Sequence, residues 1–186
     1  MNAPEPDRLD REHAQLLVVD IQEKLLPHIH GHERVLAQAE RMIRAAEVLR
    51  LPITISEQYP AGLGPTAAPL PAATRSAVKV EKTVFSCCAD AGCRRRIASV
   101  LRPQVLLVGI ETHVCVQQTA LDLLEERMQP IVLADAVGSR REFDFQIALE
   151  RMRHAGVIVT TVEAAIFRMV QDSAGDLFKR ILPIVR

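Results

Sequence analysis

The sequence predicts an α/β fold, a three-layer α/β/α arrangement built on a six-stranded parallel sheet. The first observation behind this prediction is that short apolar segments alternate along the chain with longer segments in which apolar residues have a helical spacing. The second is the composition, which is 48% hydrophobic but only 3% aromatic, so the core consists of Ala, Val, Ile and Leu. Such side chains suit a parallel sheet covered on both faces. A chain of 186 residues is long enough for one domain of this kind.

The first part of the chain is expected to contain two strands, one helix and a long loop. Residues 15–19 are a short apolar run and predict the first strand. Apolar residues recur every three or four positions over residues 33–50, which indicates an amphipathic helix. Pro52 ends that helix, and residues 53–56 predict the second strand. Four prolines and two glycines over residues 57–75 predict a long loop.

The middle of the chain continues the alternation. Residues 77–81 predict a third strand, and a helix is expected over about residues 90–101. Residues 105–109 form a β-branched, aliphatic run that predicts the fourth strand. A helix that contains Cys115 is expected to follow, and residues 131–134 predict the fifth strand.

The last part of the chain completes the sheet. A helix is expected over residues 142–155, and Gly156 separates it from a sixth strand at residues 157–161. Two further helices are predicted over residues 161–171 and 174–182. Repeated strand–helix units imply right-handed crossovers and parallel strands, so the carboxyl ends of all strands meet at one edge of the sheet.

Residues 1–13 are expected to form a flexible lead-in, and residues 14–186 a single domain. The lead-in is charged and Pro-rich and lacks the apolar stretch of a secretory signal. The chain contains no run of 18 apolar residues, so we expect no membrane span. The four cysteines form no Cys-x-x-Cys pair, which favours free thiols and a cytoplasmic location over a disulfide scaffold.

The charge balance limits the classes of partner. Lys and Arg number 23, as do Asp and Glu, and the pI is about 7.0, which argues against a nucleic-acid partner. The basic cluster at residues 94–96 is interpreted as a solvated helix face. The histidines do not lie at zinc-ligand spacing from the cysteines, so we expect no metal and no cofactor. The expected partner is a small-molecule substrate.

The segment from Gly109 to Cys115 is the strongest candidate for chemistry. Gly109 ends a buried strand, and Thr112 is a candidate N-cap, which would place Cys115 at the third helical position. The free N–H groups and the positive end of the helix dipole would favour a thiolate there and could stabilise an oxyanion. The alternative is a small buried cysteine that only packs the helix against the sheet.

Two further reactive residues are expected at the same edge of the sheet. Asp20 ends the first strand and Lys82 follows the third, whereas Cys115 follows the fourth. A carboxylate could accept the thiol proton and a lysine could stabilise both groups. Alternatively, Asp20 could cap its turn and Lys82 could be a surface charge. Asp135, at the end of the fifth strand, could compete with Asp20 as the base.

Three segments carry a resemblance to a known family. Residues 17–22, 82–86 and 109–116 resemble the signature segments of the isochorismatase-like cysteine hydrolases, in the expected order at strand ends. The resemblance extends over residues 14–172, and residues 57–66 look closest to the isochorismatase-domain-containing subgroup, whose substrates are generally unassigned. It implies a Rossmann-type strand order.

The resemblance also implies the roles of particular residues. It implies a catalytic triad of Cys115, Asp20 and Lys82, and a cis peptide bond between Ile110 and Glu111. The backbone N–H groups of Glu111 and Cys115 would then form the oxyanion hole. For His113, which invites a Cys–His dyad, the resemblance implies instead a place beside the pocket or at a subunit interface.

The expected pocket has no metal. Nicotinamidases of this family carry Asp and His ligands after the second strand, whereas residues 57–64 contain no His. We therefore expect the pocket to be lined by polar and aromatic side chains instead. The candidate substrate-binding residues are Gln22, Gln58, Tyr59, Phe85 and Thr112.

The predicted function is hydrolysis of a small amide or related C–N bond through a Cys115 thioester. The alternative is a catalytically idle protein of the same fold that binds a ligand or partner. A redox role for Cys87, Cys88 or Cys93 together with Cys115 is a third interpretation. The resemblance implies a homo-oligomer, a dimer or tetramer, and the apolar residues 177–186 could dock onto the domain itself or onto a second subunit.

Overall fold

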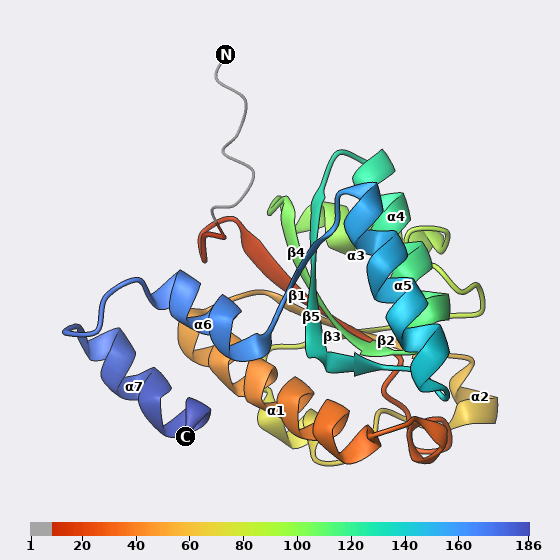
Figure 1. The fold of residues 1–186 in the computed structure, drawn as a ribbon, viewed down its shortest axis with the longest axis horizontal. Coiled ribbons are helices and arrows are strands. Elements are labelled where there is room, and N and C mark those ends of the chain that lie inside the picture. Colours follow the sequence, from red (N-terminus) through yellow and green to blue (C-terminus); the bar gives the residue numbers. More distant parts are fainter. Residues whose placement is uncertain (1–8) are drawn as a thin grey trace.

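The computed structural model describes residues 9–186 and contains one six-stranded parallel sheet (Figure 1). The strand order is β3-β2-β1-β4-β5-β6, which confirms the predicted three-layer fold and its Rossmann-type order. The strands are β1 (Ala14–Val19), β2 (Ile53–Gln58), β3 (Val78–Lys82), β4 (Gln104–Ile110), β5 (Gln129–Gly138) and β6 (Ile158–Thr160).

Helices cover both faces of the sheet. The α-helices are α1 (His32–Leu49), α2 (Pro60–Leu63), α3 (Ala91–Ser99), α4 (Gln117–Glu125), α5 (Glu142–Ala155), α6 (Val162–Val170) and α7 (Asp176–Val185). Shorter turns are η1 (Leu26–His28), η2 (Leu70–Ala73) and the π-helical η3 (Thr112–Val116). Helices α1, α6 and α7 lie on one face, and α3, α4 and α5 lie on the other (Figure 1).

The central strand β1 shows how the sequence builds two cores. All six of its residues are buried. Because successive side chains of a strand point to opposite faces, Leu16 and Val18 pack into the core under α1, whereas Leu17 and Val19 pack into the core under α3, α4 and α5. An uninterrupted apolar run is therefore what this position in the sheet requires.

Several element ends differ from the sequence prediction. Strand β5 continues beyond the predicted residue 134 to Gly138, because a register shift between Leu107 and Gly109 of β4 lets β5 pair again further along. The predicted loop over residues 57–75 contains the end of β2 and the short elements α2 and η2. Residues 1–8 of the predicted lead-in lie outside the described residues, whereas Leu9 is buried in the core under α1.

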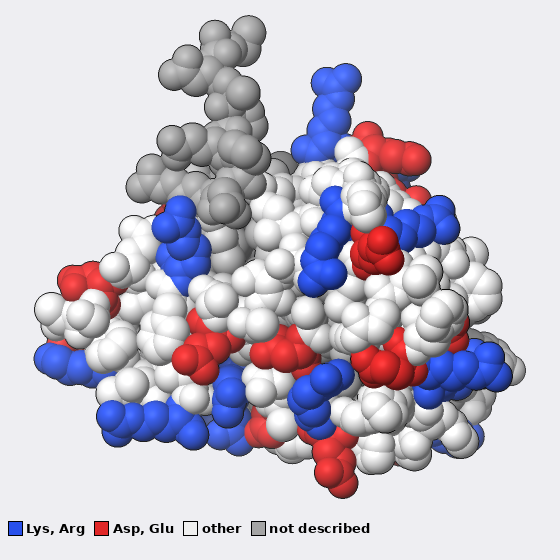
Figure 2. Space-filling view, viewed as in Figure 1, with Lys and Arg blue, Asp and Glu red and all other residues white. Residues whose placement is uncertain are grey.

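The surface carries charges of both signs. Figure 2 shows blue and red side chains interspersed over the face that it draws. Within residues 9–186, none of the helices combines the length and the apolar character needed to cross a membrane.

Candidate active site

Three strand ends bring the predicted catalytic residues together. Asp20 directly follows β1, Lys82 is the last residue of β3, and Cys115 lies in η3 after β4. All three are buried, and Cys115 retains 6% of its surface exposed. An ion pair joins Lys82 Nζ to Asp20 Oδ2 at 2.6 Å, with both side chains fully buried. Lys82 is therefore not a surface charge, and Asp20 does more than cap a turn.

The ammonium of Lys82 is surrounded by oxygen atoms. Besides Asp20 Oδ2, it donates to Gln58 Oε1 at 2.7 Å and to the carbonyls of Phe85 at 3.0 Å and Val84 at 3.3 Å. Burial is the largest single influence on the pKa of Lys82 and lowers it, but the charge of Asp20, the neighbouring Cys87 and Cys115 and the hydrogen bond to Asp20 together outweigh burial and raise that pKa above its ordinary value. Lys82 is consequently a permanent cation in this site.

The Cys115 thiol is harder to ionise than the sequence suggested. Burial and the adjacent Asp20 carboxylate raise the pKa of Cys115 to about 12, although the charge of Lys82 acts in the opposite direction. The thiol donates a hydrogen bond to the Asp20 side chain. The expectation of a ready thiolate at a helix start is therefore wrong for the resting site. The thiol keeps its proton beside a base that can accept it.

The turn between β4 and α4 differs from the predicted helix start. The Ile110–Glu111 peptide bond is cis. The Glu111 carbonyl accepts hydrogen bonds from the N–H groups of Val114 and Val116, so the chain forms a π-helical turn before α4. Cys115 is the fourth residue of this turn rather than the third of an α-helix.

Thr112 is not the N-cap of the turn. Its side chain is fully buried, and its hydroxyl has no hydrogen-bond partner within residues 9–186. The cap position belongs to Glu111, which makes no side-chain capping bond. The prediction failed because it assumed α-helical geometry from Thr112 onward, whereas the chain forms a wider π-helical turn over Thr112–Val116.

Two contacts tie this turn to the segment after β5. Glu111 Oε2 accepts hydrogen bonds from the backbone N–H of Arg140 at 2.9 Å and from its Nε at 3.1 Å. His113 Nδ1 lies 3.0 Å from Ser139 Oγ. This contact gives His113 a structural partner at the rim of the site, and it provides no support for a Cys–His dyad.

Asp135 does not compete with Asp20 as the base. Its Oδ1 accepts a hydrogen bond at 2.9 Å from the N–H of Val162, the first residue of α6. The carboxylate thus satisfies a free N–H at a helix start. Its role is to hold α6 against β5.

The predicted substrate-binding residues fall into two groups. Gln22 and Gln58 are occupied, since Gln22 Nε2 donates to the carbonyls of Gln58 and Gly64, and Gln58 Nε2 donates to the carbonyl of Thr83. Tyr59 and Phe85 are 58% and 55% exposed and lie in the segments that follow β2 and β3. Substrate contact by any of these residues, or by Thr112, stays a prediction.

Sequence reasoning missed Ser56. The hydroxyl of Ser56 donates a hydrogen bond to Asp20 Oδ1 at 2.7 Å, and its side chain is fully buried. A signal was present, because Ser56 is a polar residue at the end of the predicted strand over residues 53–56, the edge where the catalytic candidates were expected. The strand order was needed to see that this residue lies beside Asp20.

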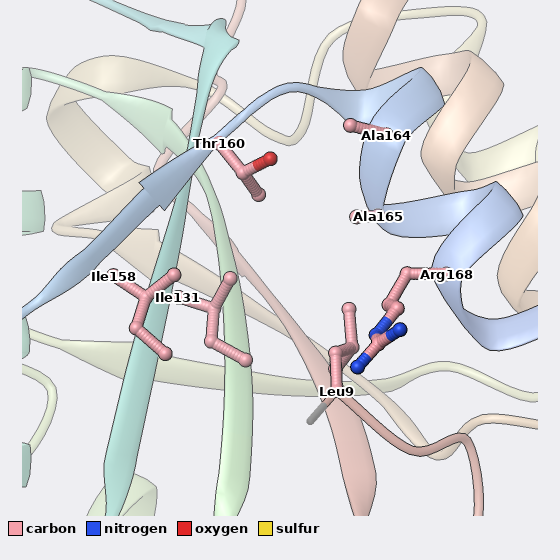
Figure 3. A pocket seen from close by; sticks show the side chains of 7 residues that line it. All are labelled: Leu9, Ile131, Ile158, Thr160, Ala164, Ala165 and Arg168. Atoms are coloured by element: carbon pink, nitrogen blue, oxygen red, sulfur yellow. The ribbon is translucent and has the colours of Figure 1, made fainter. Parts of the chain in front are cut away.

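Other concave features lie away from these residues. A cavity of about 280 Å³ between β6 and α6 is lined mainly by apolar side chains and by Arg168 (Figure 3). Neither Asp20, Lys82 nor Cys115 contributes to it. Within the described part of the chain, no three His, Cys, Asp or Glu side chains are grouped so that they could hold a metal ion.

The fold and the arrangement of these residues define an α/β protein of the isochorismatase-like hydrolase type. The isochorismatase domain matches residues 14–164, and the chain belongs to this family. Isochorismatase domain-containing protein 2A of Mus musculus is 39% identical over 179 residues, which cover 96% of this chain and 85% of the relative.

Solved structures share the same fold. The MAR1 ribonuclease from Caenorhabditis elegans is 36% identical, with a TM-score of 0.91 over 96% of this chain and 92% of that chain. The YcaC gene product from Escherichia coli, described as an octameric hydrolase of unknown specificity, is 24% identical with a TM-score of 0.88. That alignment covers 95% of this chain and 91% of YcaC.

Proposed function

We propose that this protein is a cysteine hydrolase that cleaves a small amide or a related C–N bond through a thioester on Cys115. The observation that carries the proposal is the buried contact of a thiol, a carboxylate and an ammonium group. Cys115 donates to Asp20, and Asp20 is paired with Lys82 at 2.6 Å. These three groups supply a nucleophile, a base and a fixed positive charge.

The first half of the reaction forms the thioester. Asp20 accepts the thiol proton as Cys115 Sγ attacks the carbonyl carbon of the substrate. The negative oxygen that results is stabilised by the backbone N–H groups of Glu111 and Cys115. Protonated Asp20 then gives its proton to the leaving nitrogen, the C–N bond breaks, and the amine departs.

The second half regenerates the protein. Asp20, again a carboxylate, takes a proton from a water molecule, and the hydroxide attacks the thioester carbon. The C–S bond breaks, the acid product leaves, and the proton returns to Cys115. Lys82 keeps its charge throughout and stabilises the anionic groups that alternate beside it, which agrees with its raised pKa.

The exposed residues near these groups suggest the substrate-binding surface. Tyr59 and Phe85 follow the strands that carry Gln58 and Lys82, and their rings would lie against an uncharged part of a small substrate. Gln22 and Gln58 would act by holding the segment after β2 in place. We include self-association in the proposal, as in the octameric YcaC.

The covalent mechanism is tested by incubating the protein with small primary amides and measuring the ammonia that is released. Cys115→Ala is expected to lose activity at least 1,000-fold, on the order seen when a catalytic nucleophile is removed. Cys88→Ala, which removes another buried thiol, is expected to retain activity. Mass spectrometry of the quenched wild type should find an acyl group on Cys115. Turnover by Cys115→Ala would contradict the mechanism.

The pH dependence of Cys115 alkylation by iodoacetamide tests the electrostatics. Since only the thiolate reacts and the pKa of Cys115 is about 12, labelling should accelerate as the pH rises from 7 toward 11. Asp20→Asn removes the charge that raises this pKa and should label faster at pH 7, whereas Lys82→Ala should label more slowly. Unchanged labelling in both variants would favour a binding protein without a coupled nucleophile.

A further inference from the structure

The carboxylate of Asp20 has two strong donors, and the proposed mechanism uses only one. Oδ2 accepts the ammonium of Lys82 at 2.6 Å. Oδ1 accepts the hydroxyl of Ser56 at 2.7 Å. Both Asp20 and Ser56 have no exposed surface. The second bond is therefore shielded from water, where a hydrogen bond to a charged group is strongest.

The sheet places Ser56 between the two members of the ion pair. Strand β2 lies between β1 and β3, and Ser56 is aligned with Val19 on one side and Val80 on the other. The Ser56 carbonyl also accepts the N–H of Asp20 at 3.2 Å. Ser56 consequently holds Asp20 by both its backbone and its side chain.

A buried thiol also lies beside the Ser56 hydroxyl. The Cys87 side chain lies within hydrogen-bonding distance of Ser56 and is fully buried. The Cys87 backbone is fixed in turn, because its N–H donates to Thr119 Oγ1 at 2.9 Å. Within the described residues, the oxygen acceptor of the buried Ser56 hydroxyl is Asp20 Oδ1.

We propose that Ser56 is a positioning residue that keeps Asp20 ionised and oriented until Cys115 gives up its proton. This inference rests on the proposed function. A hydroxyl that donates to a carboxylate favours the charged form, so the proton stays on the thiol in the resting site. Once Asp20 is protonated, the bond from Ser56 is weaker. The proton therefore leaves Asp20 more readily, and its transfer to the departing nitrogen is favoured.

The expected consequence of losing this hydroxyl is a specific change in the pH profile of Cys115 labelling. In Ser56→Ala, the proton shared by Asp20 and Cys115 should reside more often on Asp20. Iodoacetamide labelling at neutral pH should then rise about tenfold, and the midpoint of its acid limb should move up by about one pH unit, as expected for one charged hydrogen bond. Well below that midpoint, the two proteins should label at the same rate.

Thr54 provides a matched control on the same strand. Thr54 lies two residues before Ser56, so it points to the same face of β2, and it is equally buried. Its hydroxyl has no hydrogen-bond partner within the described residues. Thr54→Val should leave the labelling profile unchanged, and Ser56→Thr, which keeps a hydroxyl, should follow the wild type.

The outcomes separate this inference from the proposed function. Asp20→Asn could accelerate labelling while Ser56→Ala leaves the midpoint of the labelling profile unchanged. That result would overturn the role of Ser56 and leave the proposed role of Asp20 as the base intact. A uniform rate change at every pH in Ser56→Ala, or an equal shift in Thr54→Val, would also overturn it, since both indicate a general structural effect. If Asp20→Asn leaves labelling unchanged, Asp20 is not the base, and the inference falls with it.

Discussion

At the scale of single residues, the Cys115 thiol is protonated at neutral pH and lies beside the buried ion pair of Asp20 and Lys82. Cys115 has a pKa raised to about 12 by burial and by Asp20, and the pKa of Lys82 is raised because Asp20, Cys87 and Cys115 together outweigh the effect of its burial. A thiol in this state reacts slowly with stray electrophiles. In the proposed mechanism, a substrate held by the backbone N–H groups of Glu111 and Cys115 would lower the barrier to deprotonation of the thiol.

Removal of Lys82 is expected to destabilise the protein. Lys82→Met leaves the carboxylate of Asp20 buried without its cation, which should lower the free energy of unfolding by about 3 kcal/mol or more. Urea denaturation measures this change. Lys79→Met is the matched control on the same strand, because Lys79 pairs with Glu57 at 3.1 Å but its side chain is 47% exposed. That variant should lose less than about 1 kcal/mol.

A double variant distinguishes the buried charge from a loss of packing. Adding Asp20→Asn to Lys82→Met removes the uncompensated charge and should recover part of the lost stability. Equal losses in the single and double variants would show that the ion pair is not the origin of the effect.

The residues that carry the proposed chemistry were largely predictable, but their environment was not. Asp20, Lys82 and Cys115 each lie at or after the end of a recognisable strand, and parallel strands end at one edge. The raised pKa of Cys115 depends on how much water is excluded and on which charge lies nearest. Neither quantity is a property of local sequence. Ser56 was missed for a related reason, because only the pairing of β1 with β2 brings it beside Asp20.

At the scale of elements, Gly109 allows β4 to approach β1. Its φ of +135° is unfavourable for other residues, and an added Cβ would lie 2.1 Å from the carbonyl oxygen of Val19. Val19 immediately precedes Asp20. The absence of a side chain at Gly109 therefore permits Asp20 and the turn with Cys115 to meet.

Gly109→Ala is expected to disrupt the protein at this crossing. The contact is with backbone, which cannot swing aside, so we expect a loss of about 3 kcal/mol or more in the free energy of unfolding. Gly156→Ala is the control, since Gly156 has a φ of +98° but no atom within 4 Å of an added Cβ. Its loss should be only about 1 kcal/mol. Similar losses in thermal or urea unfolding would contradict the close-contact explanation.

The comparison of predicted and observed elements has a physical pattern. The helix predicted over residues 142–155 agrees with α5, because apolar periodicity and Gly156 mark its body and its end. The extension of β5 to Gly138 was missed because it depends on the irregular pairing with β4. The Thr112 cap was wrong because the chain forms a π-helical turn with Glu111 at the cap position, and α-helical spacing does not indicate such a turn.

At the scale of the whole molecule, the outer face of α5 is a candidate for self-association. Phe143 and Ile147 are four residues apart on this helix and are 73% and 48% exposed. Side chains at this spacing share one face, and adjacent exposed apolar side chains are typical of contact surfaces. Helix α5 begins just after Arg140, which contacts the Glu111 turn.

Light scattering after size exclusion tests this surface. We expect the wild type to be larger than one chain of 20.6 kDa and Phe143→Asp to shift toward the monomer. Leu101→Asp is the matched control, because Leu101 is 88% exposed but precedes β4, at the opposite end of the strands. A monomeric wild type, or an equal shift in both variants, would contradict an interface on α5.

The strand order also determines the stage of folding at which the site forms. Each parallel pairing in the sheet joins segments separated by a helix or a long connection, and such non-local contacts form slowly. Cys115 meets Asp20 only when β4 pairs with β1, and Asp20 meets Lys82 only when β2 lies between their strands. A newly made or partly folded chain therefore carries an ordinary thiol. During refolding, the labelling of Cys115 should become slow and pH-dependent again. The time at which this happens would show when the sheet is complete.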